Sequence, residues 1–303
     1  MFEPQFLEEP LVLTIVCTLL GLTVGSFLNV VIHRLPKMLE RGWKTETIAM
    51  TAEYLPAPLR ESVETWWQEQ QLAIGAASRY NLATPRSSCP HCGHVITALE
   101  NIPVLSYVVL RGRCGGCKTH ISARYPLVEL LTGVLSAGVA WHFGYGWACL
   151  GALVFVWSIV ALCFIDLDTM LLPDDITLPL LWLGLLFNIG NVFTSPPSAV
   201  AGAAVGYLVL WLVYWLFKLV TGKEGMGYGD FKLLAAIGAW LGWQVLPIVI
   251  LLSSLVGAIV GIALMVFAKH GRETPIPFGP YLGAAGVLAL FFGKPLSTVL
   301  MGI

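Results

Sequence analysis

The stretch WACLGALVFVWSIVALCFI, residues 147–165, decides the fold class, because it holds no charged residue and is followed at once by Asp166. Crossing the hydrocarbon core of a bilayer takes about 20 consecutive apolar residues, so this run is expected to span a membrane. A carboxylate at the end of such a run is costly to keep there and marks function by default. Asp230 is placed similarly, since it closes GYGD at 227–230 and precedes another apolar run.

The composition also indicates a polytopic membrane protein. Of the 303 residues, 57% are hydrophobic and 12% are charged, whereas a soluble domain carries about 25% charged residues. The first apolar run is longer than a typical signal peptide, so we expect it to be retained. We predict an all-α fold with about eight transmembrane helices, at residues 11–32, 127–145, 147–165, 176–194, 198–217, 233–246, 247–268 and 281–301.

The basic residues predict the orientation. With the N-terminus outside, 16 of the 17 Lys and Arg residues lie in cytoplasmic segments, and only Lys294 lies outside. This arrangement follows the positive-inside rule and places Asp166 and Asp230 at the same, cytoplasmic face. The chain then divides into a first span (1–32), a cytoplasmic insertion (33–125) and a multi-span domain (126–303).

Four cysteines in the insertion form two C-x2-C pairs separated by 21 residues, Cys89 with Cys92 and Cys114 with Cys117. This spacing is typical of a zinc ribbon in which four thiolates hold one structural Zn²⁺. Two disulfides or a redox pair are the alternatives, and a reducing cytoplasm disfavours disulfides. A site closed by four cysteines leaves no position for a reactive water, so we expect the zinc to be structural.

The five aspartates all lie at the expected cytoplasmic ends of spans. Asp174 and Asp175 precede an apolar run and are expected to cap a helix, while Asp168 is expected to reach water. Asp166 has apolar neighbours, and Asp230 follows a glycine-rich segment. Two carboxylates that converge on one water are the minimum for an aspartyl hydrolase. Taken alone, they fit an ion or proton pathway equally well.

Several stretches, in order along nearly the whole chain, resemble the type IV prepilin peptidases, a bacterial branch of the GxGD membrane aspartyl proteases. Besides the two cysteine pairs they are GSFLNVVIHR at 25–34, DLDTMLLPD at 166–174, GMGYGDFK at 225–232 and PIPFGP at 275–280. The resemblance implies that Asp166, rather than Asp168, forms the catalytic pair with Asp230, because the family's first aspartate stands seven residues before the proline of its Leu-Pro step.

The resemblance further implies a substrate class and a second activity. Such an enzyme of the bacterial inner membrane cleaves a basic leader from prepilins and pseudopilins at the cytoplasmic face. It then methylates the new N-terminus with S-adenosylmethionine. No G-x-G-x-x-G dinucleotide-type motif is present, so no residue is assigned to the methyl donor. The expected partners are these substrates and membrane lipid, without nucleic acid.

Two other functions are alternatives. An ion-coupled transporter would use the acidic pair as a relay, but few acids lie deep within the expected spans. A zinc hydrolase is disfavoured by the closed four-cysteine site. The sequence predicts neither the oligomeric state nor a role for residues 38–85.

Overall fold

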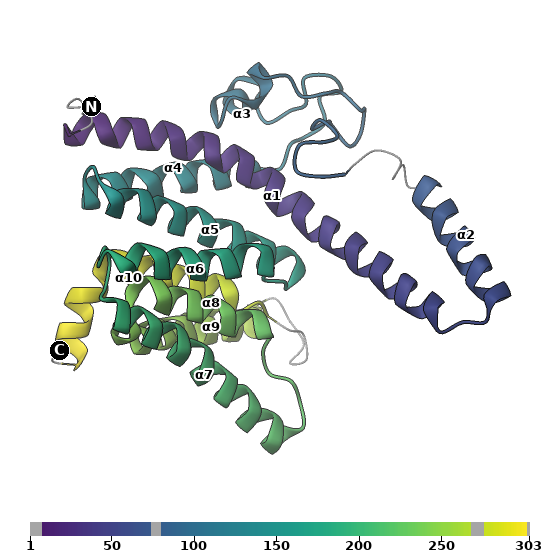
Figure 1. Ribbon diagram of the computed structural model, residues 1–303. Helices are drawn as coiled ribbons and strands as arrows, with labels where there is room; N and C mark the ends of the chain where they lie inside the picture. The colour runs from purple at the N-terminus through teal and green to yellow at the C-terminus, as the bar shows by residue number, and fades with distance from the viewer. Residues whose placement is uncertain (1–7, 74–79, 268–275, 302–303) are drawn as a thin grey trace. The chain divides into compact units, whose positions relative to one another are not determined.

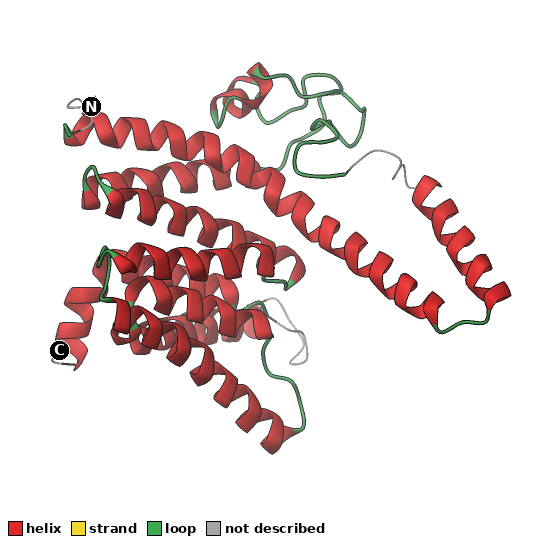
Figure 2. Cartoon of the chain, in the orientation of Figure 1, coloured by secondary structure: helices red, strands yellow, loops and turns green. Residues whose placement is uncertain are grey.

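The structure is a computed structural model and describes residues 8–73, 80–267 and 276–301. Within these ranges every extended regular element is a helix (Figures 1 and 2). The α-helices are α1 (Pro10–Glu53), α2 (Ala57–Ala73), α3 (Leu105–Val109), α4 (Arg124–Phe143), α5 (Trp147–Thr169), α6 (Asp174–Ile189), α7 (Pro196–Thr221), α8 (Tyr228–Leu241), α9 (Leu246–Phe267) and α10 (Gly279–Met301), and two short 3-10 helices are η2 (Leu99–Asn101) and η3 (Trp243–Val245).

The prediction of an all-helical polytopic membrane protein is confirmed. Each of the eight apolar runs falls on a helix of its own. Among the described residues, five helical segments are long and apolar enough to cross a membrane, namely α1, α4, α5, α7 and Trp243–Phe267. The apolar part of α10, Gly279–Gly293, is shorter. The count of eight spans stays a prediction, because α6 and α8 have 16 and 14 residues and lengths of only about 24 and 21 Å.

The chain forms two compact units. One combines Met1–Gly25 with Leu130–Ile303, and the other is Ser26–Glu129. The first unit holds helices α5 to α10, and the second holds the four cysteines.

Helix α8 is the core of the first unit. It packs against α6, α7 and α10, and from Phe231 to Trp240 only Lys232 is not buried. Gly202 and Gly206 let the backbone of α7 come close to the backbone of α8. A Cβ on Gly206 would lie 2.7 Å from the carbonyl oxygen of Leu234. Such glycine pairs four residues apart are common where membrane helices pack closely. The short helix that carries Asp230 is therefore held firmly from several sides.

A glycine separates α8 from α9. Gly242 has a φ of +87°, a conformation that other residues rarely adopt, and η3 follows it before α9 begins at Leu246. The two neighbouring apolar runs, 233–246 and 247–268, thus belong to distinct helices.

Contacts between segments distant in the sequence order the second unit. Asn29 of α1 donates a hydrogen bond to the carbonyl oxygen of Tyr125 in α4, at 3.0 Å. Arg34 donates to the carbonyl oxygens of Asn81 and Pro85. Asn29, a polar residue inside an apolar run, thus links α1 to α4 by a hydrogen bond.

Candidate active site and cysteine cluster

Asp166 and Asp230 each lie at the end of a helix. Asp166 is in the last turn of α5, where its carbonyl oxygen accepts a hydrogen bond from the amide of Met170, the left-handed residue that ends the helix. Asp230 is in the first turn of α8, three residues after the N-cap Gly227. The amide of Gly227 donates a hydrogen bond to the Asp230 side chain. Both carboxylates are thus positioned by helix termini rather than by mobile loops.

Burial separates these two acids from the other three aspartates. Asp166 and Asp230 are 4% and 6% exposed as whole residues, whereas Asp168, Asp174 and Asp175 are exposed. Burying two carboxylates costs free energy of folding, so their burial indicates a functional role. The expectation that water reaches Asp168 agrees with its exposure.

The polar contacts of the two buried acids differ. Oδ2 of Asp166 accepts a hydrogen bond from the backbone amide of Gly279, at 2.9 Å. Oδ1 of Asp230 is buried and has no hydrogen-bond partner within the described part of the chain. The two carboxylates are close enough for their charges to interact.

Close backbone packing brings three segments together at these acids. A Cβ on Gly279 would lie 2.6 Å from Oδ2 of Asp166, and a Cβ on Gly229 would lie 2.7 Å from the Cβ of Leu172. The Cδ2 atom of Leu172 would in turn be 3.2 Å from a Cβ on Gly279. The end of α5, the start of α8 and the start of α10 therefore converge around the pair. A glycine in α8 and one at the first position of α10 make this possible.

An ion pair links the starts of α6 and α8. Nζ of Lys232 lies 2.6 and 2.7 Å from the two carboxylate oxygens of Asp174. The expected capping role of Asp174 is corrected, since the N-cap of α6 is Pro173 and no side chain caps the helix. Asp174 and Asp175 do supply negative charge to the first turn, which the helix dipole favours. No local sequence pattern indicates this ion pair, because Lys232 and Asp174 stand 58 positions apart.

The four cysteines of the second unit form one cluster. Cys89, Cys92, Cys114 and Cys117 place their sulfur atoms within 4.8 Å of one another. The Cys89–Cys117 and Cys92–Cys114 sulfur separations are 3.8 and 3.9 Å. A zinc–sulfur bond of about 2.3 Å would set the sulfurs of a tetrahedral site about 3.8 Å apart. The cluster could therefore hold a metal ion such as zinc, and all four cysteines are free thiols.

The thiols of the cluster differ in acidity. Hydrogen bonds from the hydroxyl and amide of Thr119 lower the pKa of Cys117 to about 6. The amide of His94 lowers the pKa of Cys92, but the neighbouring thiols and burial outweigh it and raise that pKa to about 11. Thiolates are the metal-binding form. One thiol is thus readily ionised, while the crowding of the other sulfurs resists a full set of thiolates without a cation.

His94 serves the cluster indirectly. Its Nε2 lies 3.0 Å from Oε1 of Glu100, and the amide and hydroxyl of Thr97, together with His94, lower the pKa of Glu100 to about 2. A Cβ on Gly115 would collide with that carboxylate. The His94–Glu100 pair therefore packs against the second cysteine pair, where glycine makes room for it.

Comparisons with known proteins agree with these positions. A family model described as "Bacterial Peptidase A24 N-terminal domain" matches residues 19–143, and one described as "Type IV leader peptidase family" matches residues 153–262. A protein of Aeromonas hydrophila is 59% identical over 92% of this chain and 90% of its own length. One of Stutzerimonas stutzeri is 53% identical over 98% and 97%. Both are named "Prepilin leader peptidase/N-methyltransferase". No solved structure matches.

Proposed function

The chain belongs to the type IV leader peptidase family, and from that premise we infer that it cleaves the leader from prepilins and then methylates the new N-terminus. The observation that carries the peptidase half is the buried pair Asp166 and Asp230. These residues are the proposed catalytic dyad. The transporter alternative has no support among the relatives, which are named for peptidase and methyltransferase activities.

Two neighbouring carboxylates suffice for peptide hydrolysis. One, ionised, takes a proton from water while the water oxygen forms a bond to the scissile carbonyl carbon. The other, protonated, donates its proton to the carbonyl oxygen. The carbon–nitrogen bond then breaks, and the leaving amine takes up the proton held by the first carboxylate. A hydroxyl group of the intermediate returns its proton to the second carboxylate as the new carboxyl group forms, so both acids regain their starting states. Burial around Asp166 and Asp230 limits access of bulk water, which strengthens the electrostatic interactions of the reacting groups.

We propose that the methyltransferase site lies in the N-terminal part of the chain. Bound S-adenosylmethionine would supply a methyl group to the new N-terminal amine. The segment 25–34 and the insertion 33–125 are the candidate regions. The four cysteines are proposed to hold one structural Zn²⁺, which would order residues 85–120 rather than take part in peptide hydrolysis.

The protein is an integral membrane protein by its apolar helices, and we place it in the inner membrane. We further propose that its N-terminus is outside and that the dyad faces the cytoplasm. A prepilin could then keep its apolar segment in the bilayer while its basic leader stays in the cytoplasm. Pseudopilins of similar construction are proposed as further substrates.

The function is tested with the purified full-length protein in detergent, mixed with a full-length prepilin. Mass spectrometry should show loss of the leader without S-adenosylmethionine. With S-adenosylmethionine, the cleaved product should gain the mass of one methyl group at its N-terminus. An intact prepilin after prolonged incubation would refute the peptidase. Cleavage without methylation would refute only the second activity.

A further inference from the structure

A group of exposed apolar side chains lies on the second unit, between the two cysteine pairs. Its five members belong to η2, α3 and the turn that joins them, and their exposed fractions run from 39% to 77%. We call this group the η2–α3 surface, and it consists of Leu99, Ile102, Leu105, Val108 and Val109. Large apolar side chains gathered on one short segment mark a contact with another protein or with a membrane.

Helix α3 keeps its apolar side chains apart from its internal contacts. Leu105, Val108 and Val109 have i, i+3 and i+4 spacing, so they share one face of the helix. Tyr107 lies on the opposite side, where its hydroxyl donates a hydrogen bond to the carbonyl oxygen of Ile121, at 3.3 Å. One side of α3 is therefore used for packing within the unit, and the apolar side is left open.

Two hydrogen bonds tie this segment to residues of the expected membrane spans. The amide of Val104, directly before α3, donates to Oε2 of Glu129, at 2.7 Å. The hydroxyl of Ser26 donates to Oδ1 of Asn101, the last residue of η2, at 3.4 Å. Ser26 and Glu129 lie within apolar runs of α1 and α4, and all four residues belong to the second unit. The η2–α3 surface is thus held at the level where these two helices enter the bilayer.

The backbone of Val104 shows that this attachment is specific. Its φ is +59°, a conformation that is rare for a β-branched residue. Such a conformation costs free energy and persists only where surrounding contacts fix it. The carboxylate of Glu129 supplies one of these contacts, so α3 starts at a fixed point beside α4.

The charges around the surface fit an anionic partner. Arg111 and Arg113 follow α3, both are exposed, and neither forms an ion pair with any residue that the structure describes. Glu100 is the only acid in residues 99–113, and its carboxylate is 3.0 Å from Nε2 of His94. Apolar side chains flanked by arginines are typical of segments that bind the interface of a bilayer containing anionic lipid.

We propose that the η2–α3 surface docks on the bilayer. Its apolar side chains enter the nearer leaflet, and Arg111 and Arg113 bind the phosphates of anionic lipids. The insertion is then attached to the membrane at a third place, besides α1 and α4. The unit that holds the cysteine cluster therefore lies against the membrane surface. This inference does not rest on the proposed catalytic activities.

Photocrosslinking tests the contact. A benzophenone amino acid replaces Val109, which is 71% exposed, in the full-length protein reconstituted in nanodiscs of phosphatidylcholine and phosphatidylglycerol. The matched control places the same probe at Tyr54, an 85% exposed aromatic residue of the same unit. Residue 54 follows residue 32, the expected end of the first span, by 22 positions, or about 33 Å of helix.

We expect lipid adducts from the probe at Val109, assigned to acyl chains by mass spectrometry, and several-fold fewer from the probe at Tyr54. Equal yields at the two positions, or no lipid adduct at Val109, would overturn the proposal. A parallel sample contains a prepilin. Adducts of Val109 with the prepilin or with a second copy of the chain, in place of lipid, would also overturn it, because they would identify a surface for protein docking.

The arginines predict a preference among lipids. Phosphatidylglycerol should be enriched several-fold in the Val109 adducts over its share of the bilayer, and the double variant Arg111→Gln with Arg113→Gln should lose this enrichment. Lys44→Gln, which removes an exposed positive charge farther along α1, should keep it. Enrichment that persists without the arginines, or an equal loss in Lys44→Gln, would overturn their assignment to lipid phosphates. The probe at Val109 alone leaves both arginines in place, so the contact is tested even if the double variant fails to fold.

Discussion

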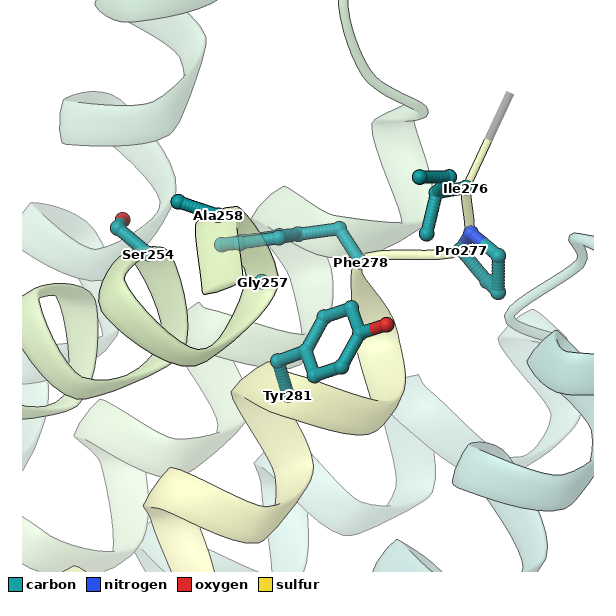
Figure 3. Close-up of a pocket in the computed structure, with 7 residues that line it drawn as sticks. All are labelled: Ser254, Gly257, Ala258, Ile276, Pro277, Phe278 and Tyr281. Atoms are coloured by element: carbon teal, nitrogen blue, oxygen red, sulfur yellow. The ribbon is translucent and has the colours of Figure 1, made fainter. Parts of the chain in front are cut away.

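The backbone amide of Gly279 donates a hydrogen bond to Oδ2 of Asp166, with 2.9 Å between the two atoms and 113 positions between the two residues. The start of α10 therefore orients an acid that belongs to α5. The PIPFGP segment at 275–280 therefore helps to position a catalytic acid, because its glycine has no side chain and its amide can contact the buried carboxylate. The residues before this glycine, Ile276, Pro277 and Phe278, line a groove together with residues of α9 (Figure 3).

Replacing Gly279 with alanine should slow cleavage. The added Cβ would lie 2.6 Å from Oδ2 of Asp166, so the carboxylate or the α10 segment must move. Misplacing a catalytic group by about 1 Å can cost about 100-fold in rate, and we expect a loss of 10- to 100-fold in kcat. The control is Gly138→Ala, where a Cβ would make only ordinary contact, at 3.7 Å from Phe291. Equal activity of the two variants would show that Gly279 does not position the acid.

Breaking the Lys232–Asp174 ion pair should reduce activity more than stability. Exposed ion pairs stabilise proteins by about 0.2–1 kcal/mol, and Asp174 is 54% exposed. Because Lys232 stands two residues after Asp230, we expect Lys232→Met to lower the cleavage rate several-fold with little change in melting temperature. The double variant Lys232→Asp with Asp174→Lys should recover part of the rate. Lys44→Met, which removes another 2.6 Å pair, is the control. No recovery in the double variant would argue against the pair.

The purified protein should contain one Zn²⁺ per chain. Cys114→Ser should abolish this stoichiometry, measured by elemental analysis, because a tetrahedral site with three thiolates binds zinc more weakly. Hydrogen exchange should then increase over residues 85–120, while some prepilin cleavage remains. Cys17→Ala, in the first unit, should keep the metal. Metal-free wild-type protein with unchanged exchange protection would contradict the zinc proposal.

Asp168→Asn should retain substantial peptidase activity. Its side chain is exposed at the end of α5, whereas that of Asp166, two residues earlier, is buried. The measurement is initial-rate cleavage of one prepilin by both asparagine variants at equal protein concentration. Complete loss in Asp168→Asn would mean that the wrong carboxylate of the pair has been assigned.

Much of this architecture was predictable from local sequence. Apolar runs identified each of the helices α4 to α10, and spacing alone brought together Cys89, Cys92, Cys114 and Cys117. The apolar neighbours of Asp166 indicated its burial, in contrast to Asp168. These features depend on the composition and periodicity of short segments, which a single sequence displays.

Contacts between distant segments could not be predicted in the same way. Neither the amide of Gly279 nor the pairing of Lys232 with Asp174 leaves a local pattern, since each depends on how separate helices end beside one another. The shortness of this apolar run was predicted, but the bounds of α8 were not, since the helix begins at Tyr228 and ends at Leu241. Gly242 and the 3-10 turn after it end the helix, although the apolar run continues to residue 246.

The most direct test of the account replaces Asp166 and Asp230 separately with asparagine, which keeps size and polarity but removes the acid. Each variant is given an intact prepilin and, in parallel, a pilin whose leader has already been removed, together with S-adenosylmethionine. The account predicts no leader cleavage by either variant and normal methylation of the pre-cleaved pilin, which shows that the protein is folded. Wild-type cleavage by either variant would contradict the assignment of the dyad.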